Sequence, residues 1–203
     1  MTDVTAGLSG ALGVESAVLP MSDDPVSTVL ETREGRLEFQ EYFVRRRQRD
    51  EVLGVELRGI EEARPTESVL AAISGADAII VCPSNPVVSV GPILALPGMR
   101  EALASSSAPK VAVSPIVGGR ALKGPADRML ASLGHEVSST GVARMYADLV
   151  DGMVVDWIDE GERAGIESIG MRVRLTDVVM RDAADRGRLA SETLQFGARM
   201  VAH

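Results

Sequence analysis

Short apolar runs alternate with longer segments of helical spacing along most of the chain. Continuous apolar runs bounded by Gly, Pro, Asn or Asp predict strands, and apolar residues three and four positions apart predict helices. The predicted strands of the main sheet are Ala78–Cys82, Lys110–Val113, Met153–Asp156 and Met171–Asp177. This alternation is typical of an α/β domain with a mainly parallel sheet. Because Ala78–Cys82 is apolar throughout, we expect that strand to be buried on both faces.

Capping residues mark the predicted helices. Ser68–Gly75 has Thr66 as a candidate N-cap and Gly75 as a candidate C-cap. Pro125 suits the first turn of a helix that ends at Gly134. The remaining predicted helices are the crossover Gly91–Ser107, a helix ending near Val150, a charged helix after Asp156, and a last helix from about Asp182 to Met200.

The first 64 residues follow a weaker pattern of strands and short helices, after a helix-like opening at Val4–Gly13. We expect residues 1–64 to form a mixed α/β lid or subdomain region and residues 65–203 to form the α/β core, within one structural domain. Nucleotide-binding α/β domains commonly open with an apolar strand that runs into a glycine-rich turn. The sequence given does not open with such a strand.

Composition and charge narrow the class of partner. The chain has 203 residues, 45% of them hydrophobic, which is enough to bury a core. Its formal net charge of −8 repels polyanions, so we expect neither nucleic acid nor a membrane as the main partner. No apolar run reaches the roughly 20 residues that span a bilayer, and no secretory signal opens the sequence. We expect a cytoplasmic protein.

The sequence offers few soft metal ligands or nucleophiles. It has one cysteine, Cys82, and two histidines, His135 and His203, which do not form a zinc-site pattern. Cys82 ends an apolar run, so we interpret it as a small core residue. His135 follows a predicted helix end, so we expect it in a solvent-facing loop.

Two loops leave the carboxyl ends of adjacent predicted strands, where parallel sheets bind ligands. The first begins at Pro83 and includes Ser84 and Asn85, and the second runs from Ser114 to Gly119. Their hydroxyls, amide and glycines suit phosphate, and Lys123 adds a positive charge. Neither loop matches a nucleotide fingerprint, and Gly118-Gly119 alone is equally compatible with a tight turn between a strand and a helix.

Other polar and aromatic groups each allow two interpretations. Asp23 and Asp24 suit a weak magnesium site or a turn before Pro25. The arginines at 45–47 with Arg49 suit a clamp for an anionic substrate or a solvated basic face. Phe39, Tyr42 and Phe43 suit a stacking surface for a planar ligand or part of the core.

Taken in order, several segments resemble the 2-phospho-L-lactate transferase family of deazaflavin coenzyme F-420 biosynthesis. These segments are "PMSDDPV", "FQEYFVRRR", "CPSNPVVSVGPILALPGMREAL", "VAVSPIVGGRALKGPADRML", "GVARMYADLVDG" and "LTDVVM". The resemblance runs from near Val4 to near Met200. It implies a Rossmann-like three-layer fold, a homodimer and a Mg²⁺ cofactor. It also implies transfer of a phospholactyl or phosphoenolpyruvyl group from a GDP-linked donor to the deazaflavin 7,8-didemethyl-8-hydroxy-5-deazariboflavin (FO), with release of GMP.

The resemblance also implies which residues face each substrate, while the catalytic base stays unassigned. The expected donor residues are Ser84, Asn85, Pro86, Ser89, Ser114, Pro115, Gly118, Gly119 and Lys123. The expected deazaflavin residues are Phe39, Gln40, Glu41 and Tyr42.

The sequence departs from the family pattern at its start. Members of the family open with a strand and a glycine-rich turn that holds nucleotide phosphates and the metal, and this sequence has neither. We therefore expect the chain to match the later part of the family, with most metal ligands outside it. The alternative to a transferase is a non-catalytic binding or dimerisation fragment of one.

Overall fold

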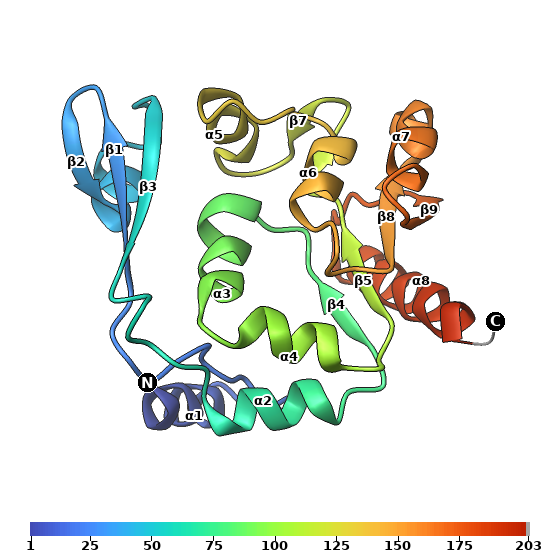
Figure 1. Ribbon diagram of the computed structural model, residues 1–203, viewed down its shortest axis with the longest axis horizontal. Coiled ribbons are helices and arrows are strands. Elements are labelled where there is room, and N and C mark those ends of the chain that lie inside the picture. Colours follow the sequence, from blue (N-terminus) through green and yellow to red (C-terminus); the bar gives the residue numbers. More distant parts are fainter. Residues whose placement is uncertain (202–203) are drawn as a thin grey trace.

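The computed structural model describes residues 1–201, so residues 202–203 of the predicted core lie outside the described residues. The main sheet contains four parallel strands in the order β4-β5-β8-β9 (Figure 1). These strands are β4 (Ile79–Val81), β5 (Lys110–Val113), β8 (Gly152–Asp156) and β9 (Arg172–Thr176). The predicted parallel sheet is therefore confirmed, and each strand begins and ends within one residue of the expected position.

Alternate residues of the central strands pack on opposite faces of this sheet. Ala112 and Met153 point into a core that includes residues of α6 (Ser139–Met145) and α7 (Arg163–Glu167). Val111 and Val154 point into a second core that includes Leu189 of α8 (Ala183–Val201). Helices thus cover both faces, which gives the three layers that were predicted.

The segments around β4 form as the capping residues predict. Helix α2 (Glu67–Ser74) begins after Thr66, whose hydroxyl oxygen accepts a hydrogen bond from the amide of Val69 at 3.2 Å. The crossover from β4 to β5 is helical but broken. It consists of a π-helical turn Pro86–Val90, α3 (Gly91–Ala95) and α4 (Met99–Ser105).

The expectation of a fully buried strand at Ala78–Cys82 is wrong. β4 is an edge strand of the described sheet, its three residues are only half-buried, and Cys82 is exposed. An apolar run indicates that a strand is at least partly buried, but it does not show whether the strand lies at the centre or at the edge of its sheet. The interpretation of Cys82 as a core residue is therefore wrong too, whereas His135 is exposed in a loop as expected.

Two elements after β5 also differ from the sequence prediction. Ile116–Val117 (β6) and Arg120–Ala121 (β7) form a short antiparallel hairpin where a turn into a helix was expected. Helix α5 (Ala126–Ser132) starts after Pro125 as predicted. Helix α6 ends at Met145, not near Val150, and the left-handed backbone of Asp148 (φ 67°) is incompatible with a continuing helix.

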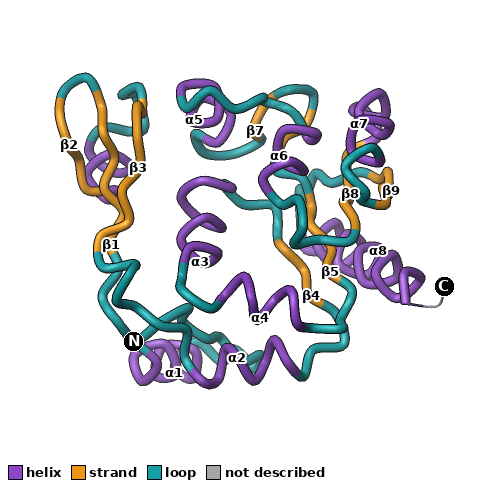
Figure 2. Tube along the Cα trace, in the orientation of Figure 1, coloured by secondary structure: helices purple, strands orange, loops and turns teal. Residues whose placement is uncertain are grey.

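Residues 27–58 form a separate antiparallel sheet in the order β2-β1-β3 (Figure 2). Its strands are β1 (Ser27–Thr32), β2 (Gly35–Glu38) and β3 (Val52–Arg58). Leu30 and Val52 of this sheet pack with Met129 of α5 in a shared core. Helix α1 (Thr2–Ala11) precedes it and has no buried residue. The proposed division near residue 64 stays a prediction.

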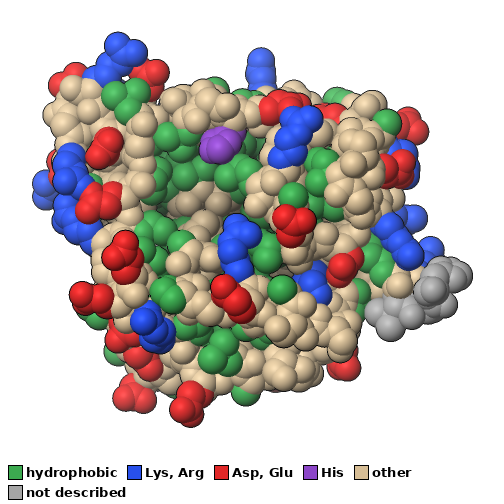
Figure 3. Space-filling model, viewed as in Figure 1, with side chains coloured by type: hydrophobic (Ala, Val, Ile, Leu, Met, Phe, Trp, Pro, Cys, Tyr) green, Lys and Arg blue, Asp and Glu red, His purple; other side chains and the backbone are tan. Residues whose placement is uncertain are grey.

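The surface is hollowed between the antiparallel sheet and helices α3 and α5, and apolar side chains gather in the hollow (Figure 3). Among the residues described, no single helix has both the length and the hydropathy to cross a bilayer. One pair of helical segments, Pro86–Ala95 and Met99–Ser105, meets those two criteria jointly but is bent by 83°.

Candidate functional site

A pocket of about 300 Å³ lies at the carboxyl ends of the main-sheet strands. We call it the strand-end pocket. Its walls come from the segments after β4, β5 and β9, from the segment after the β6–β7 hairpin and from the start of α5. Its lining residues are Pro83, Ser84, Asn85, Ser114, Pro115, Leu122, Lys123, Ala126, Val178, Val179 and Met180. Crevices at this edge of parallel sheets are the usual ligand sites.

The strand-end pocket brings together five of the expected donor residues and leaves out four. Ser84, Asn85, Ser114, Pro115 and Lys123 line it. The four outside its lining are Pro86, which is buried at the start of the π-helical turn, Ser89, which is exposed on that turn, and Gly118 and Gly119 of the hairpin.

Asn85 is held in one orientation by the backbone it caps. Its Oδ1 accepts hydrogen bonds from the amides of Val87 at 2.9 Å and Val88 at 3.3 Å. Its Nδ2 points to Sδ of Met129 at 3.6 Å, a weak acceptor. The side-chain amide nitrogen therefore remains a strong donor that Asn85 can offer a ligand.

Ser114 is buried and its hydroxyl is already used inside the protein. Its Oγ accepts from the amide of Ile116 at 3.1 Å and lies 2.8 Å from Oγ of Ser139. A hydroxyl with this many internal partners fixes the loop instead of reaching a ligand. Half-buried Ser84 and exposed Lys123 are the better ligand contacts in the same pocket.

Gly118 and Gly119 form the turn of the hairpin, with φ of 56° and 72°. Two consecutive positive φ values are what a tight two-residue hairpin turn requires, so glycine is needed here for the turn. The amide of Gly118 donates to both carboxylate oxygens of Asp159, each at 3.0 Å. Sequence reasoning missed Asp159, because nothing in the local pattern links residues 41 positions apart.

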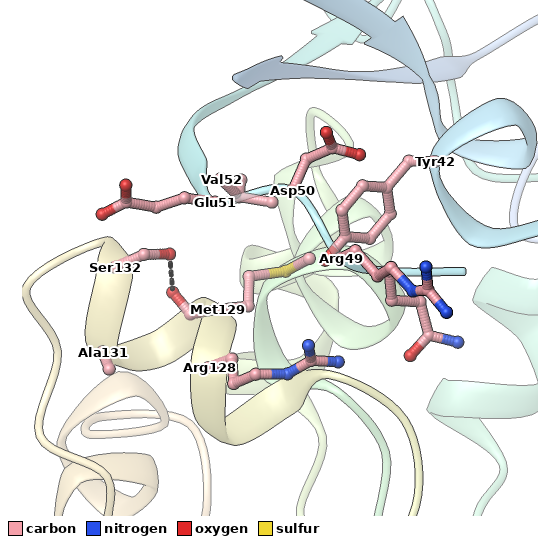
Figure 4. A pocket seen from close by; sticks show the side chains of 10 residues that line it. Tyr42, Arg49, Asp50, Glu51, Val52, Arg128, Met129, Ala131 and Ser132 are labelled. Carbon is pink, nitrogen blue, oxygen red and sulfur yellow. Dashed lines mark hydrogen bonds between the residues drawn. The ribbon is translucent and has the colours of Figure 1, made fainter. Parts of the chain in front are cut away.

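A second pocket, of about 410 Å³, lies between the loop before β3 and helix α5 (Figure 4). We call it the arginine pocket. Its lining residues are Tyr42, Gln48, Arg49, Asp50, Glu51, Val52, Arg128, Met129, Ala131 and Ser132. Met129 lines this pocket and contacts Asn85 of the strand-end pocket, so α5 stands between the two.

The expected deazaflavin residues surround this second pocket only in part. Tyr42 lines it and is almost fully buried; burial raises the pKa of its phenol, and the nearby Arg128 guanidinium opposes that rise. Phe39 stacks on Phe43 with ring centroids 5.5 Å apart. Gln40 is exposed and Glu41 is half-buried, and neither is among the lining residues.

A family model described as 2-phospho-L-lactate transferase CofD matches residues 1–178. The chain belongs to the CofD family.

CofD relatives match nearly all of the chain but extend beyond it. The chain is 41% identical over 195 residues to the 2-phospho-L-lactate transferase of Methanosarcina mazei, covering 96% of this chain and 64% of that protein. It is 42% identical over 190 residues to the phosphoenolpyruvate transferase of Streptomyces griseus, covering 91% and 60%. The chain therefore spans less than two thirds of the length of these relatives.

Two solved structures of one protein from Bacillus halodurans share the fold. A member of the UPF0052 family aligns with a TM-score of 0.64 and 19% identity over 91% of this chain and 64% of that one. A second structure aligns with a TM-score of 0.66 and 19% identity over 96% and 69%. At this identity the likeness concerns the α/β fold alone.

The described residues do not include a set of ligands that fits the Mg²⁺ expected from the family resemblance. Asp23 accepts from the amide and hydroxyl of Thr2 and pairs with the terminal ammonium of Met1 at 2.8 Å, which lowers its pKa to about 2. Asp24 accepts from the amide of Arg64 at 3.0 Å. No group of three or more acidic, His or Cys side chains gathers within residues 1–200. The Mg²⁺ cofactor stays a prediction.

Proposed function

We propose that this CofD-family chain is a transferase of coenzyme F-420 biosynthesis. It moves a phospholactyl or phosphoenolpyruvyl group from a GDP-linked donor to the deazaflavin FO and releases GMP. The observation that carries the proposal is the strand-end pocket, where residues expected at the donor from three separate segments line one cavity. The names of the relatives, 2-phospho-L-lactate transferase and phosphoenolpyruvate transferase, support the choice of transferred group.

The chemistry of the strand-end pocket suits the phosphates of the donor. Lys123 supplies a positive charge, Ser84 a hydroxyl and Asn85 an amide donor fixed by its cap. Apolar side chains of Leu122, Val178 and other lining residues form the rest of the wall and suit the nucleoside. Positioning and charge neutralisation are the main demands of phosphoryl-type transfer.

The proposed reaction exchanges one P–O bond for another. A hydroxyl oxygen of FO bonds to the phosphorus that carries the three-carbon acid, and the proton of that hydroxyl passes to solvent water. The bond from that phosphorus to the bridging oxygen breaks, and GMP leaves with that oxygen.

The stacked pair Phe39–Phe43, with Phe43 partly exposed, supports placing the flat ring of FO beside the arginine pocket.

Titration of GDP into the purified chain tests the donor site. We expect Lys123→Gln to weaken GDP binding about tenfold, the effect of losing one charge-assisted contact in a partly exposed site. Arg120→Gln is the matched control, because Arg120 is exposed on the adjacent hairpin and does not line the pocket. Equal GDP affinity in wild type and Lys123→Gln contradicts the donor site.

Mixing the chain with the GDP-linked donor, FO and Mg²⁺ and measuring GMP release tests the reaction itself. Saturable FO binding without GMP release would favour the alternative, a non-catalytic binding fragment. The homodimer and the cytoplasmic location stay predictions, and sedimentation of the purified chain tests the first of them.

A further inference from the structure

The arginine pocket contains two acidic and two basic side chains, and each acidic one lies near an arginine that does not line the pocket. Oε2 of Glu51 lies 2.7 Å from Nε of Arg33. Oδ1 of Asp50 lies 3.9 Å from Nη1 of Arg46. Glu51 is thus closely paired with an arginine outside the pocket, whereas Asp50 is only loosely paired and its Oδ2 is buried with no hydrogen-bond partner among the described residues.

Arg49 and Arg128 are the basic side chains of the pocket, and they come from different elements. Arg49 precedes β3, whereas Arg128 belongs to α5. Within residues 1–200, neither guanidinium makes an ion pair with a carboxylate, although many other arginines of the chain do. Figure 4 shows both guanidinium groups on the same side of Met129, while Glu51 extends to the other side.

The backbone before β3 adopts a costly conformation that delivers Arg49 to the pocket. Arg47 and Gln48 have left-handed φ values of 51° and 58°. Left-handed backbone is unfavourable for residues other than glycine, and strain of this kind concentrates at functional sites. The amide of Gln48 donates to the carbonyl of Tyr42 at 3.0 Å, which closes the turn.

We propose that Arg49 and Arg128 bind the carboxylate of a small phosphorylated acid. This rests on the proposed function, in which the phosphates of the donor occupy the strand-end pocket. The relatives are named for phospholactate and phosphoenolpyruvate, and both of these acids carry a carboxylate on the carbon that bears the phosphate group. Guanidinium groups match the planar carboxylate with paired hydrogen bonds.

The position of the arginine pocket fits the acid end of such a donor. Asn85 lines the strand-end pocket, and its Nδ2 lies 3.6 Å from Sδ of Met129, which lines the arginine pocket. Helix α5 contributes Ala126 to the first pocket and Arg128 to the second. A donor with its diphosphate beside Asn85 therefore has a cationic site next to it for its acid group.

Calorimetric titration with two ligands tests the carboxylate site. The ligands are 2-phospho-L-lactate and ethyl phosphate, which keeps the phosphate and the two-carbon chain but lacks the carboxylate. We expect Arg49→Gln and Arg128→Gln each to raise the Kd of 2-phospho-L-lactate about tenfold, and neither to change the Kd of ethyl phosphate. Arg186→Gln on α8, also exposed, is the matched control and should change neither.

Three results overturn the proposal. The first is that the wild type does not bind 2-phospho-L-lactate. The second is that both pocket variants keep the wild-type Kd for 2-phospho-L-lactate. The third is that the variants lose as much affinity for ethyl phosphate as for 2-phospho-L-lactate, which would place a phosphate between the arginines. Titration with GDP separates this proposal from the donor site. If GDP does not bind the wild type while 2-phospho-L-lactate binding depends on both arginines, the donor site fails and the carboxylate site stands.

Discussion

Asp159 joins two segments that are distant in sequence at the edge of the candidate donor site. It lies in the 3₁₀ turn Trp157–Glu162 that follows β8, and its buried carboxylate accepts from the amide of Gly118. The hairpin that carries Gly118 leads directly to Leu122 and Lys123 of the strand-end pocket. One carboxylate thereby fixes where the pocket-lining segment begins.

We expect Asp159→Ala to destabilise the protein by about 1–3 kcal/mol, because the Gly118 amide loses its acceptor in a partly buried position. Urea unfolding measures the loss, and faster hydrogen exchange at the Gly118 amide locates it. Glu160→Ala, an exposed neighbour, serves as the control. An unchanged exchange rate at Gly118 would show that the hairpin does not depend on this bond.

The glycine pair shows where residue-level prediction ends. From the sequence, Gly118-Gly119 was compatible with a tight turn or with a phosphate-binding backbone, and the structure gives both glycines positive φ. Whether such a backbone binds a phosphate or forms a hairpin turn depends on which group accepts the hydrogen bond from the Gly118 amide. That partner is Asp159, brought there by the order of the strands and not by any local pattern.

At the scale of elements, the start of α6 packs so closely that it admits no added atom. A Cβ on Gly141 would lie 2.1 Å from the carbonyl oxygen of Glu136. We expect Gly141→Ala to lower the free energy of unfolding by about 1–3 kcal/mol, because the backbone of the turn or the helix must shift.

Gly187 of α8 is the matched control, because a Cβ there meets nothing within 4 Å. Gly187→Ala should stabilise the protein by about 0.5–1 kcal/mol through helix propensity. Thermal unfolding of both variants compares them directly. A stabilising Gly141→Ala would mean that the turn at Glu136 adjusts freely.

Arg181 links the end of β9 to the start of α8 through two carboxylates. Its guanidinium donates to Asp177 at 2.8 Å and to Asp185 at 3.2 Å. The bond from the Arg181 side chain lowers the pKa of Asp177, and the bond from the Arg181 amide, aided by its side chain, lowers that of Asp185. Since both folded pKa values lie below the ordinary 3.8, the stabilisation is present above that pH and is lost as the pH falls through the folded values.

Replacing Arg181 by glutamine should therefore lower stability at about pH 7 and make it fall less as the pH drops below about 4. Urea unfolding at a series of pH values measures both effects, and Arg186→Gln on the adjacent helix α8 controls for loss of a positive charge. Parallel acid-unfolding curves for wild type and Arg181→Gln would contradict this account.

Element prediction succeeded where the local sequence decides and failed where neighbours decide. Thr66 caps α2 as expected, because a side chain three residues from its partner amide needs no tertiary contact. The apolar run of β4 did not reveal an edge position, since burial of a strand depends on which strands flank it. The apolar spacing after Met145 continued past the true end of α6, which the left-handed Asp148 excludes from the helix.

At the scale of the whole molecule, topology places the candidate site. The parallel order of β4 and β5 brings Asn85 and Ser114 to one edge, so their proximity was predictable from two strands alone. The arginine pocket was not predictable in this way. It needs Arg49 from beside the antiparallel sheet and Arg128 from α5, whose contact depends on a shared core far from either loop.

From the core shared by the antiparallel sheet and α5, we predict how the molecule unfolds. Leu30 and Val52 of the antiparallel sheet bury against Met129 of α5, so neither part completes its core alone. We expect one cooperative transition, with amides of Leu30 in β1 and Val154 in β8 exchanging hydrogen by the same global opening. Met129→Ala should cost about 2–5 kcal/mol and accelerate both amides by the same factor. Exchange that accelerates at Leu30 but not at Val154 would instead show that the antiparallel sheet opens as an independent unit, which is the behaviour of a separate subdomain.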